Sequence, residues 1–310
     1  MLTPEQKEAR RSLVGASEVP SLVGLCDRPA PIDILQSKLG VDTFEGNEFT
    51  ELGDALEEPI AQLWARRNGV KIRRHAMVRH PRFRHVGASP DFVVAAGEVL
   101  TPEDLNVEVK TAGMWAASEF GEELTDQVVP RYLGQAQVQM ACLGVVATRL
   151  VALVAGELRE YRIAFDKELA DELCATADEW FRRHVVEGKP LEPDGSPAFT
   201  AYIASRFKKE SGEVLTAPAE ASAAFAEWRK LKAQAEELEA RAAVAEQKVR
   251  MAVGNASEMV GDGWAVTLKE QERKTTDWKA LCSSLGVEAA TVEQFTKKSA
   301  FRVLRVKGVK

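Results

Sequence analysis

The segments Ser89-Pro90-Asp91-Phe92-Val93-Val94-Ala95 and Asn106-Val107-Glu108-Val109-Lys110 decide the fold of this sequence. Both contain short runs rich in β-branched residues with turn-forming residues between them, so the sequence predicts two strands, at 92–95 and 106–110. Successive side chains of a strand point to opposite faces, so Glu108 and Lys110 share one face and the valines of their segment the other. Two charged side chains on one face of an apolar strand are costly to bury without partners.

These charged residues have the chemistry of a metal site. Asp91 and Glu108 offer carboxylate oxygens, which Mg²⁺ prefers, and a lysine beside them can orient or deprotonate a water molecule. Phosphodiester cleavage needs both a cation against the developing charge and a positioned water. Taken alone, Ser89-Pro90-Asp91 is better explained as a turn, and Glu108 with Lys110 as an exposed strand pair. The segments therefore indicate a nuclease site only together with further motifs.

The sequence around them alternates helical and strand patterns. Leu52, Leu56 and Ile60 recur at four-residue spacing and predict a helix over 49–68. Residues 3–26 begin with a proline at the first helical position and continue as a buried turn. Further helices are expected at 128–144 and 166–187, and a hairpin around Gly156 at 150–154 and 158–163. This order predicts an α/β fold with a mixed central sheet flanked by helices.

The last third of the chain has a different composition. The segment 188–197 is rich in Pro and Gly and is expected to end the core domain or its regular structure. From 220 to 253 apolar residues alternate at spacings of four and three, a heptad seam of about four heptads. Acidic and basic residues are mixed along it, which favours a helical hairpin or an oligomer contact over a DNA-binding arm. With strands expected at 264–268 and 301–306, the domains are predicted as 1–210 and 211–310.

Composition bounds the class of protein. The chain has 310 residues, 45% hydrophobic and 28% charged, which is typical of a globular protein with a proper core. A net charge of −6 argues against a generally basic DNA binder but leaves room for a local basic patch. The four cysteines form no CxxC pair, and the sequence shows neither an export signal nor a long apolar run. We expect a cytoplasmic protein with reduced thiols and no membrane partner.

Four ordered motifs resemble those of one family. Asp91, Glu108 and Lys110 resemble the PD-(D/E)xK nuclease signature. The surrounding motifs are similar to those of the lambda-exonuclease/YqaJ viral recombinase family, and the likeness continues to about residue 190. They are the phosphate-binding motif Arg10-Arg11-Ser12-Leu13-Val14-Gly15-Ala16-Ser17-Glu18, the helical glutamate motif at 53–61 and the glutamine motif at 130–140. The resemblance implies a restriction-endonuclease-like core.

The resemblance also implies roles for single residues. Asp91 and Glu108 would be the main metal ligands, with the Val109 carbonyl a third. Lys110 would position or activate water. From the helix, Glu57 would complete the site, although the adjacent Glu58 is the alternative. Arg10 and Ser17 would hold the terminal 5′ phosphate, and either Gln135 or Gln137 would contact substrate or support Lys110. The alternatives without a DNA-binding role are that Ser17 is a helix N-cap, that Arg10 is a solvated charge, and that the glutamines form the polar surface of a helix.

The implied function is a phage-type exonuclease that resects linear double-stranded DNA from 5′ to 3′ during recombination. It would use Mg²⁺, with Mn²⁺ as a substitute, and would act in a bacterial host cell with a single-strand-annealing protein as partner. A homo-oligomer is also expected. The alternatives are a structure-specific endonuclease, a Cas4-like nuclease, which the scattered cysteines disfavour, and a non-catalytic DNA-binding or interaction protein.

One physical argument for DNA stands apart from the family. The stretch 71–85 holds six Lys and Arg residues and no acid, and it leads directly to Asp91. A basic strand pair beside carboxylates is a plausible guide for phosphates. The alternative is that these charges only keep surface strands soluble.

Overall fold

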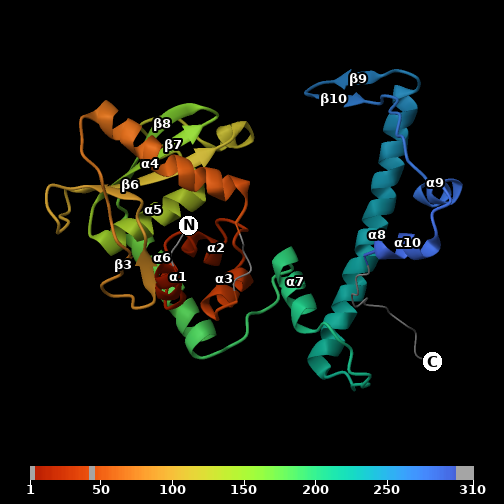
Figure 1. Cartoon of the computed structure of the whole chain (residues 1–310), viewed down its shortest axis with the longest axis horizontal. Helices are drawn as coiled ribbons and strands as arrows, with labels where there is room; N and C mark the ends of the chain where they lie inside the picture. Colours follow the sequence, from red (N-terminus) through yellow and green to blue (C-terminus); the bar gives the residue numbers. More distant parts are fainter. Residues whose placement is uncertain (1–3, 42–45, 298–310) are drawn as a thin grey trace. The chain divides into compact units, whose positions relative to one another are not determined.

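The structure, a computed structural model, describes residues 4–41 and 46–297. It consists of two compact units, Met1–Arg206 and Phe207–Lys310, whose elements are labelled in Figure 1. The strand expected at 301–306 lies outside the described residues.

A five-stranded mixed sheet forms the centre of the first unit, in the order β2-β5-β6-β7-β8. β6 and β7 are parallel, with Glu108 opposite Leu150, and the other neighbours are antiparallel. The expected hairpin is formed by β7 and β8, which turn at Gly156 with φ 92°. The strands are β2 Arg73–Arg74, β5 Phe92–Val94, β6 Leu105–Ala112, β7 Ala147–Val154 and β8 Glu157–Ala164.

Two long helices cover the two faces of this sheet (Figure 1). Helix α4 (Glu48–Asn68) packs Ile60 and Trp64 against the β6 valines, and helix α5 (Pro130–Leu143) packs against the opposite side chains of β5 and β7. Local sequence sets their ends: Asn47 accepts the Thr50 N–H at the start of α4, and Gly69, with φ 64°, ends it. The mixed sheet flanked by helices is confirmed, and β6 turns its charged residues toward α5.

A small second sheet connects the N-terminal motif to this core. β4 (Val86–Ala88) pairs in parallel with β1 (Val14–Gly15) and antiparallel with β3 (Val78–Arg79). Gly87 is required at the centre, because a Cβ there would lie 2.8 Å from Leu13 Cδ2 and 3.0 Å from the Val78 carbonyl oxygen. The sheet therefore holds the Arg10–Glu18 motif, the basic stretch and the strand that leads to Asp91 together.

The remaining helices of the first unit include one that the sequence did not indicate. Helix α7 (Pro197–Arg206) buries Phe199 against Ala30, Ile32 and Leu35. The expectation that the segment 188–197 ends the regular structure of the core is therefore wrong, because the apolar residues after it still pack on the core. The others are α1 Pro4–Arg11, α2 Val19–Leu22, α3 Pro31–Lys38, α6 Lys167–Phe181, the 3₁₀ helix η1 Met114–Glu119 and the π-helical turn η2 Arg182–Val186.

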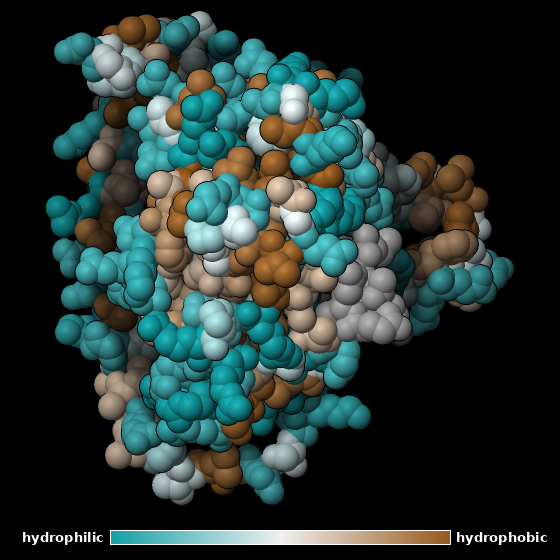
Figure 2. Space-filling view, turned by 90° about the vertical axis from the view of Figure 1, so that its left-hand side faces the viewer, coloured by the Kyte–Doolittle hydropathy of each residue, from teal (hydrophilic) through white to brown (hydrophobic). Residues whose placement is uncertain are grey.

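The second unit is built on one long helix. Helix α8 (Ala219–Val253) confirms the expected heptad helix. It is followed by the antiparallel pair β9 (Glu258–Gly261) and β10 (Trp264–Thr267), and by helices α9 (Trp278–Ser284) and α10 (Ala289–Gln294). On the face of the first unit that Figure 2 shows, hydrophilic and hydrophobic residues are interspersed. Among the described residues, no helix combines the length and apolarity that a membrane span requires.

Candidate active site

The Asp91 side chain is hydrogen-bonded to the backbone of β6, the strand that carries Glu108 and Lys110. Asp91 lies between β4 and β5, and β5 pairs with β6 so that Phe92 faces Val107. Its Oδ2 accepts the Val109 N–H at 2.8 Å. The two segments that the sequence singled out are thereby joined, and Asp91 lies next to Glu108 and Lys110.

Glu108 is buried and held by three donors. Its side chain is 3% exposed. Oε1 accepts hydrogen bonds from Lys110 Nζ and, at 2.5 Å, from Gln135 Nε2, while Oε2 accepts one from Gln139 Nε2 at 2.7 Å. Burial alone would lower the pKa of Lys110, but the charges of Glu108 and Asp91 outweigh it and raise that pKa. The lysine is therefore a fixed cation beside the carboxylates.

Negative charge is in excess around Asp91. Burial, and then the charges of Glu108 and Glu57, raise the pKa of Asp91 well above its ordinary value, against the opposing charge of Lys110. Carboxylates that oppose one another's ionisation in this way are stabilised by a nearby cation. The Asp91 region therefore has the electrostatics of a cation site.

Of the two helical glutamates, Glu57 faces the site. Arg74 donates to Glu57 Oε1 at 2.9 Å and to Glu58 Oε2 at 3.0 Å, so both glutamates are paired. Only Glu57 lines a cavity of about 230 Å³, which it shares with Val109 and Lys110. Its side chain is 25% exposed and that of Glu58 56%. The geometry therefore favours Glu57 over Glu58.

The donor set fits a hard divalent cation, although it is not a closed cage. Over the described parts of the chain, no three His, Cys, Asp or Glu side chains converge as a ready-made metal cluster. The reason lies in the strand geometry: Glu108 points toward α5 and is bound by Lys110 and glutamines, whereas Glu57 approaches from α4. Oxygen donors from Asp91, Glu108 and Glu57 match the preference of Mg²⁺. A cation would compete with Lys110 and Arg74 for these carboxylates.

The sequence did not single out Gln139 and Asn106, which support Glu108 within the core. Gln139, 1% exposed, links Glu108 to Asn106, whose Nδ2 donates to Gln139 Oε1 at 2.8 Å and to Thr148 Oγ1 at 3.1 Å. Asn106 Oδ1 is buried without a partner among the described residues. The available signal was spacing: Gln135 and Gln139 are four apart on one helix face, and Asn106 shares its strand face with Glu108.

Gln137 points elsewhere. It is 2% exposed, donates to the Ala164 carbonyl at 2.8 Å and accepts the Asp166 N–H at 2.8 Å. These contacts tie α5 to the turn before α6. Of the two glutamines expected at the substrate, the structure brings Gln135 to Glu108 and gives Gln137 a bracing position within the fold.

Arg10 and Ser17 lie together, as a shared phosphate site requires. Arg10 Nη2 donates to Ser17 Oγ at 3.3 Å, and it passes so close to Gly15 that a Cβ there would lie 3.2 Å from it. Ser17 is not a helix cap, since α2 begins after Glu18. Glu18 instead accepts the Gly15 N–H at 2.7 Å and two hydrogen bonds from buried Lys38, a residue that sequence reasoning did not single out.

The basic stretch adjoins this motif. Arg79 donates to Ser12 Oγ at 2.5 Å, two residues from Arg10. Arg79 and Arg84, with His80 and His85, line a cavity of about 440 Å³. Arg74 is instead engaged by the helical glutamates, so the stretch divides between the carboxylates and the phosphate motif.

The sequence of this unit matches a known family. Residues 5–148 match the YqaJ-like viral recombinase domain. The chain carries a YqaJ-like viral recombinase domain. Every candidate residue from Arg10 to Gln137 lies inside the matched range, so the YqaJ-like domain contains both the phosphate motif and the carboxylate site. The resemblance inferred from the four motifs is confirmed.

Solved structures that are similar to the chain include two exonucleases. LHK-Exo, an alkaline exonuclease from Laribacter hongkongensis solved in complex with dAMP, is 22% identical, with 60% of this chain and 94% of that chain covered and a TM-score of 0.48. A phage-related exonuclease from Haemophilus somnus 129PT is 15% identical, with 57% and 96% covered and a TM-score of 0.44. At these values the likeness does not by itself assign an activity to the YqaJ-like domain. No curated protein matches the sequence.

Proposed function

We propose that this protein is a Mg²⁺-dependent DNA exonuclease that resects linear duplex DNA from 5′ to 3′ in phage-type recombination. The observation that carries the proposal is the convergence of Asp91, Glu108 and Lys110, two carboxylates and a cation from separate segments, at the middle strand β6 of the central sheet. The family match adds a viral recombinase context. The end preference rests on the Arg10–Ser17 pair.

Each residue then has a defined task. Asp91, Glu108 and Glu57 would hold the cation, with the Val109 carbonyl as a further oxygen. When bound, Mg²⁺ supplies charge neutralisation at the phosphate and lowers the pKa of water. Lys110, with its raised pKa, keeps its protons and donates hydrogen bonds to orient water or a phosphate oxygen. Mn²⁺, which accepts similar oxygen ligands, is expected to substitute.

Recognition of the DNA end would fall to the basic motif. A guanidinium donates two parallel hydrogen bonds to a phosphate, and the Ser17 hydroxyl beside Arg10 adds a third donor. Gln135, bonded to Glu108, would contact substrate near the scissile bond. A single-strand-annealing protein that loads on the exposed 3′ strand is the expected partner.

The test is a release assay on 5′-phosphorylated linear duplex with Mg²⁺. We expect the wild type to release nucleotides, Asp91→Ala and Lys110→Ala to release about a hundredfold less or none, and the exposed matched control Lys167→Ala to behave as wild type. A wild type that releases nothing, or variants that release as much as it does, would refute the nuclease assignment.

Two further substrates test the finer claims. Closed circular duplex DNA has no end, so its cleavage would refute the exonuclease assignment and favour an endonuclease. Duplexes labelled at either the 5′ or the 3′ end report polarity, and early loss of the 5′ label is expected.

A further inference from the structure

Helix α8 presents an apolar stripe along its whole length. It has 35 residues, which corresponds to about 52 Å, and only Val253 among them is buried. Trp228 is 37% exposed, Leu231 53% and Leu238 59%. A helix of this length with a continuous exposed seam needs a partner to bury it, because propensity alone contributes little to helix stability.

Large and small residues follow one another along the seam in an order that lets two antiparallel copies of α8 fit together. If a second α8 runs antiparallel, with the twofold axis between Glu236 and Glu237, each bulky seam residue meets an alanine of the second copy. In four of the five layers this pairing puts a large side chain against a small one, as close helix packing requires, and the outermost layer pairs two alanines. The layers are Ala221 with Ala252, Ala224 with Val249, Trp228 with Ala245, Leu231 with Ala242, and Ala235 with Leu238.

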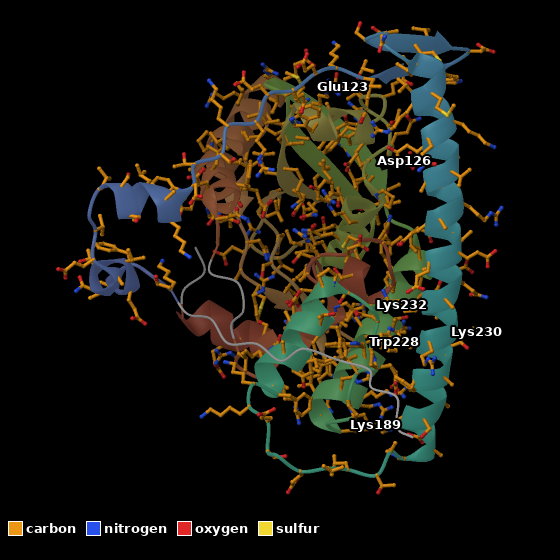
Figure 3. All side chains as sticks on the ribbon, turned by 90° about the vertical axis from the view of Figure 1, so that its right-hand side faces the viewer. Glu123, Asp126, Lys189, Trp228, Lys230 and Lys232 are labelled. Atoms are coloured by element: carbon orange, nitrogen blue, oxygen red, sulfur yellow. The ribbon has the colours of Figure 1, made fainter. Side chains whose placement is uncertain are left out.

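The charges beside the seam agree with the same register. In it, Lys232 flanks Glu239 of the second copy and Glu227 flanks Lys248, each twice by symmetry. No like charges are nearest neighbours across the interface. Figure 3 shows Trp228 and Lys232 on one side of the α8 ribbon and Lys230 on the other, as the seam requires.

A parallel in-register pair fits less well. Its flanking charges are also opposite, since Glu227 would meet Lys232. Each seam residue, however, would meet its own copy, so Trp228 would face Trp228 and Ala235 would face Ala235. Layers that are alternately overfilled and empty cost packing energy.

We propose that α8 is a self-association helix, through which two copies of this chain form an antiparallel twofold coiled coil. The partner is a second copy because the seam complements its own reversed sequence along the helix and the flanking charges pair at Lys232 with Glu239 and at Glu227 with Lys248. The proposal is independent of the nuclease assignment, since it concerns the second unit alone.

Light scattering after size exclusion of the full chain gives the first test. We expect twice the 34.0 kDa mass of one chain. Lys232→Glu would place like charges together and weaken the dimer by about tenfold, and adding Glu239→Lys would restore it. Lys230→Glu, the same charge change on the outer face, is the matched control and should leave the dimer intact. A monomer at every concentration would overturn the proposal.

Cysteine cross-linking decides the orientation. Under mild oxidation, a mixture of Ala221→Cys and Ala252→Cys chains should form a cross-linked dimer, whereas each variant alone should not exceed the parent chain with its native cysteines. Cross-linking of each variant alone would reveal a parallel pair and refute the antiparallel register. Absence of cross-linking in the mixture would refute the contact itself.

Discussion

Replacing Gln139 by leucine should remove one of the side chains that hold Glu108 in place, while the rest of the fold is kept. The change removes the donor to Glu108 Oε2 and the acceptor for Asn106 Nδ2. A hydrogen bond to a charged group contributes about 1.5–3 kcal/mol and a neutral one about 1 kcal/mol, so Gln139→Leu should lower the free energy of unfolding by about 2.5–4 kcal/mol.

Gln137→Leu is the matched control. Gln137 is on the same helix and equally buried, but its two bonds are to neutral backbone groups, so about 2 kcal/mol should be lost. Urea unfolding measures both losses. Only Gln139→Leu should also lower kcat and raise the Mg²⁺ concentration at half-maximal rate, because only it frees Glu108 to move.

The comparison has a clear refutation. If both variants lose stability and neither changes kcat or the Mg²⁺ dependence, Gln139 is a packing residue and does not position Glu108. If Gln137→Leu also impairs the Mg²⁺ dependence, the effect is a general consequence of loosening α5.

Three further changes test other parts of the structure. Asp91→Asn keeps an acceptor for the Val109 N–H but removes a carboxylate that lies close to other negative charges. In EDTA this variant should therefore unfold at a higher temperature than wild type, while its activity is lost. A lower unfolding temperature would contradict the repulsion between the carboxylates. Lys38→Met removes the buried cation that pairs with Glu18, whose side chain is 15% exposed, and should cost about 3 kcal/mol in urea unfolding. A loss below about 1 kcal/mol would show that the pair is dispensable. Arg10→Ala should slow resection of 5′-phosphorylated ends by about ten- to a hundredfold and spare 5′-hydroxyl ends, with Arg11→Ala as control; equal slowing on both ends would exclude a phosphate contact.

The parts of the fold that follow local rules were predictable. Alternation along β6 placed Glu108 and Lys110 on one face, and the four-residue spacing of apolar residues located α4. What depends on distant contacts was not. Lysine is rarely buried, so nothing in the sequence marked Lys38 as the partner of Glu18. The proline- and glycine-rich segment hid the fact that Phe199 returns to the core.

The candidate site shows the same division. Its charged residues were chosen from motifs, but which glutamine supports Glu108 depends on the rotation of α5 over the sheet. That rotation turns Gln135 and Gln139 toward β6 and Gln137 away from it. The sequence does not say how far α5 is rotated about its own axis over the sheet, so which glutamines face β6 is known only from the packing.

The enclosure of Glu108 bears on whether the domain needs a metal ion in order to fold. Both carboxylate oxygens are satisfied by groups of the chain itself, with Lys110 as built-in counterion. Folding of the YqaJ-like domain is therefore separable from metal loading, unlike in domains whose folding energy comes from the ion. Under the proposed function, a newly made chain would reach its native state before it binds the ion, and it would become active only where both the ion and a DNA end are present.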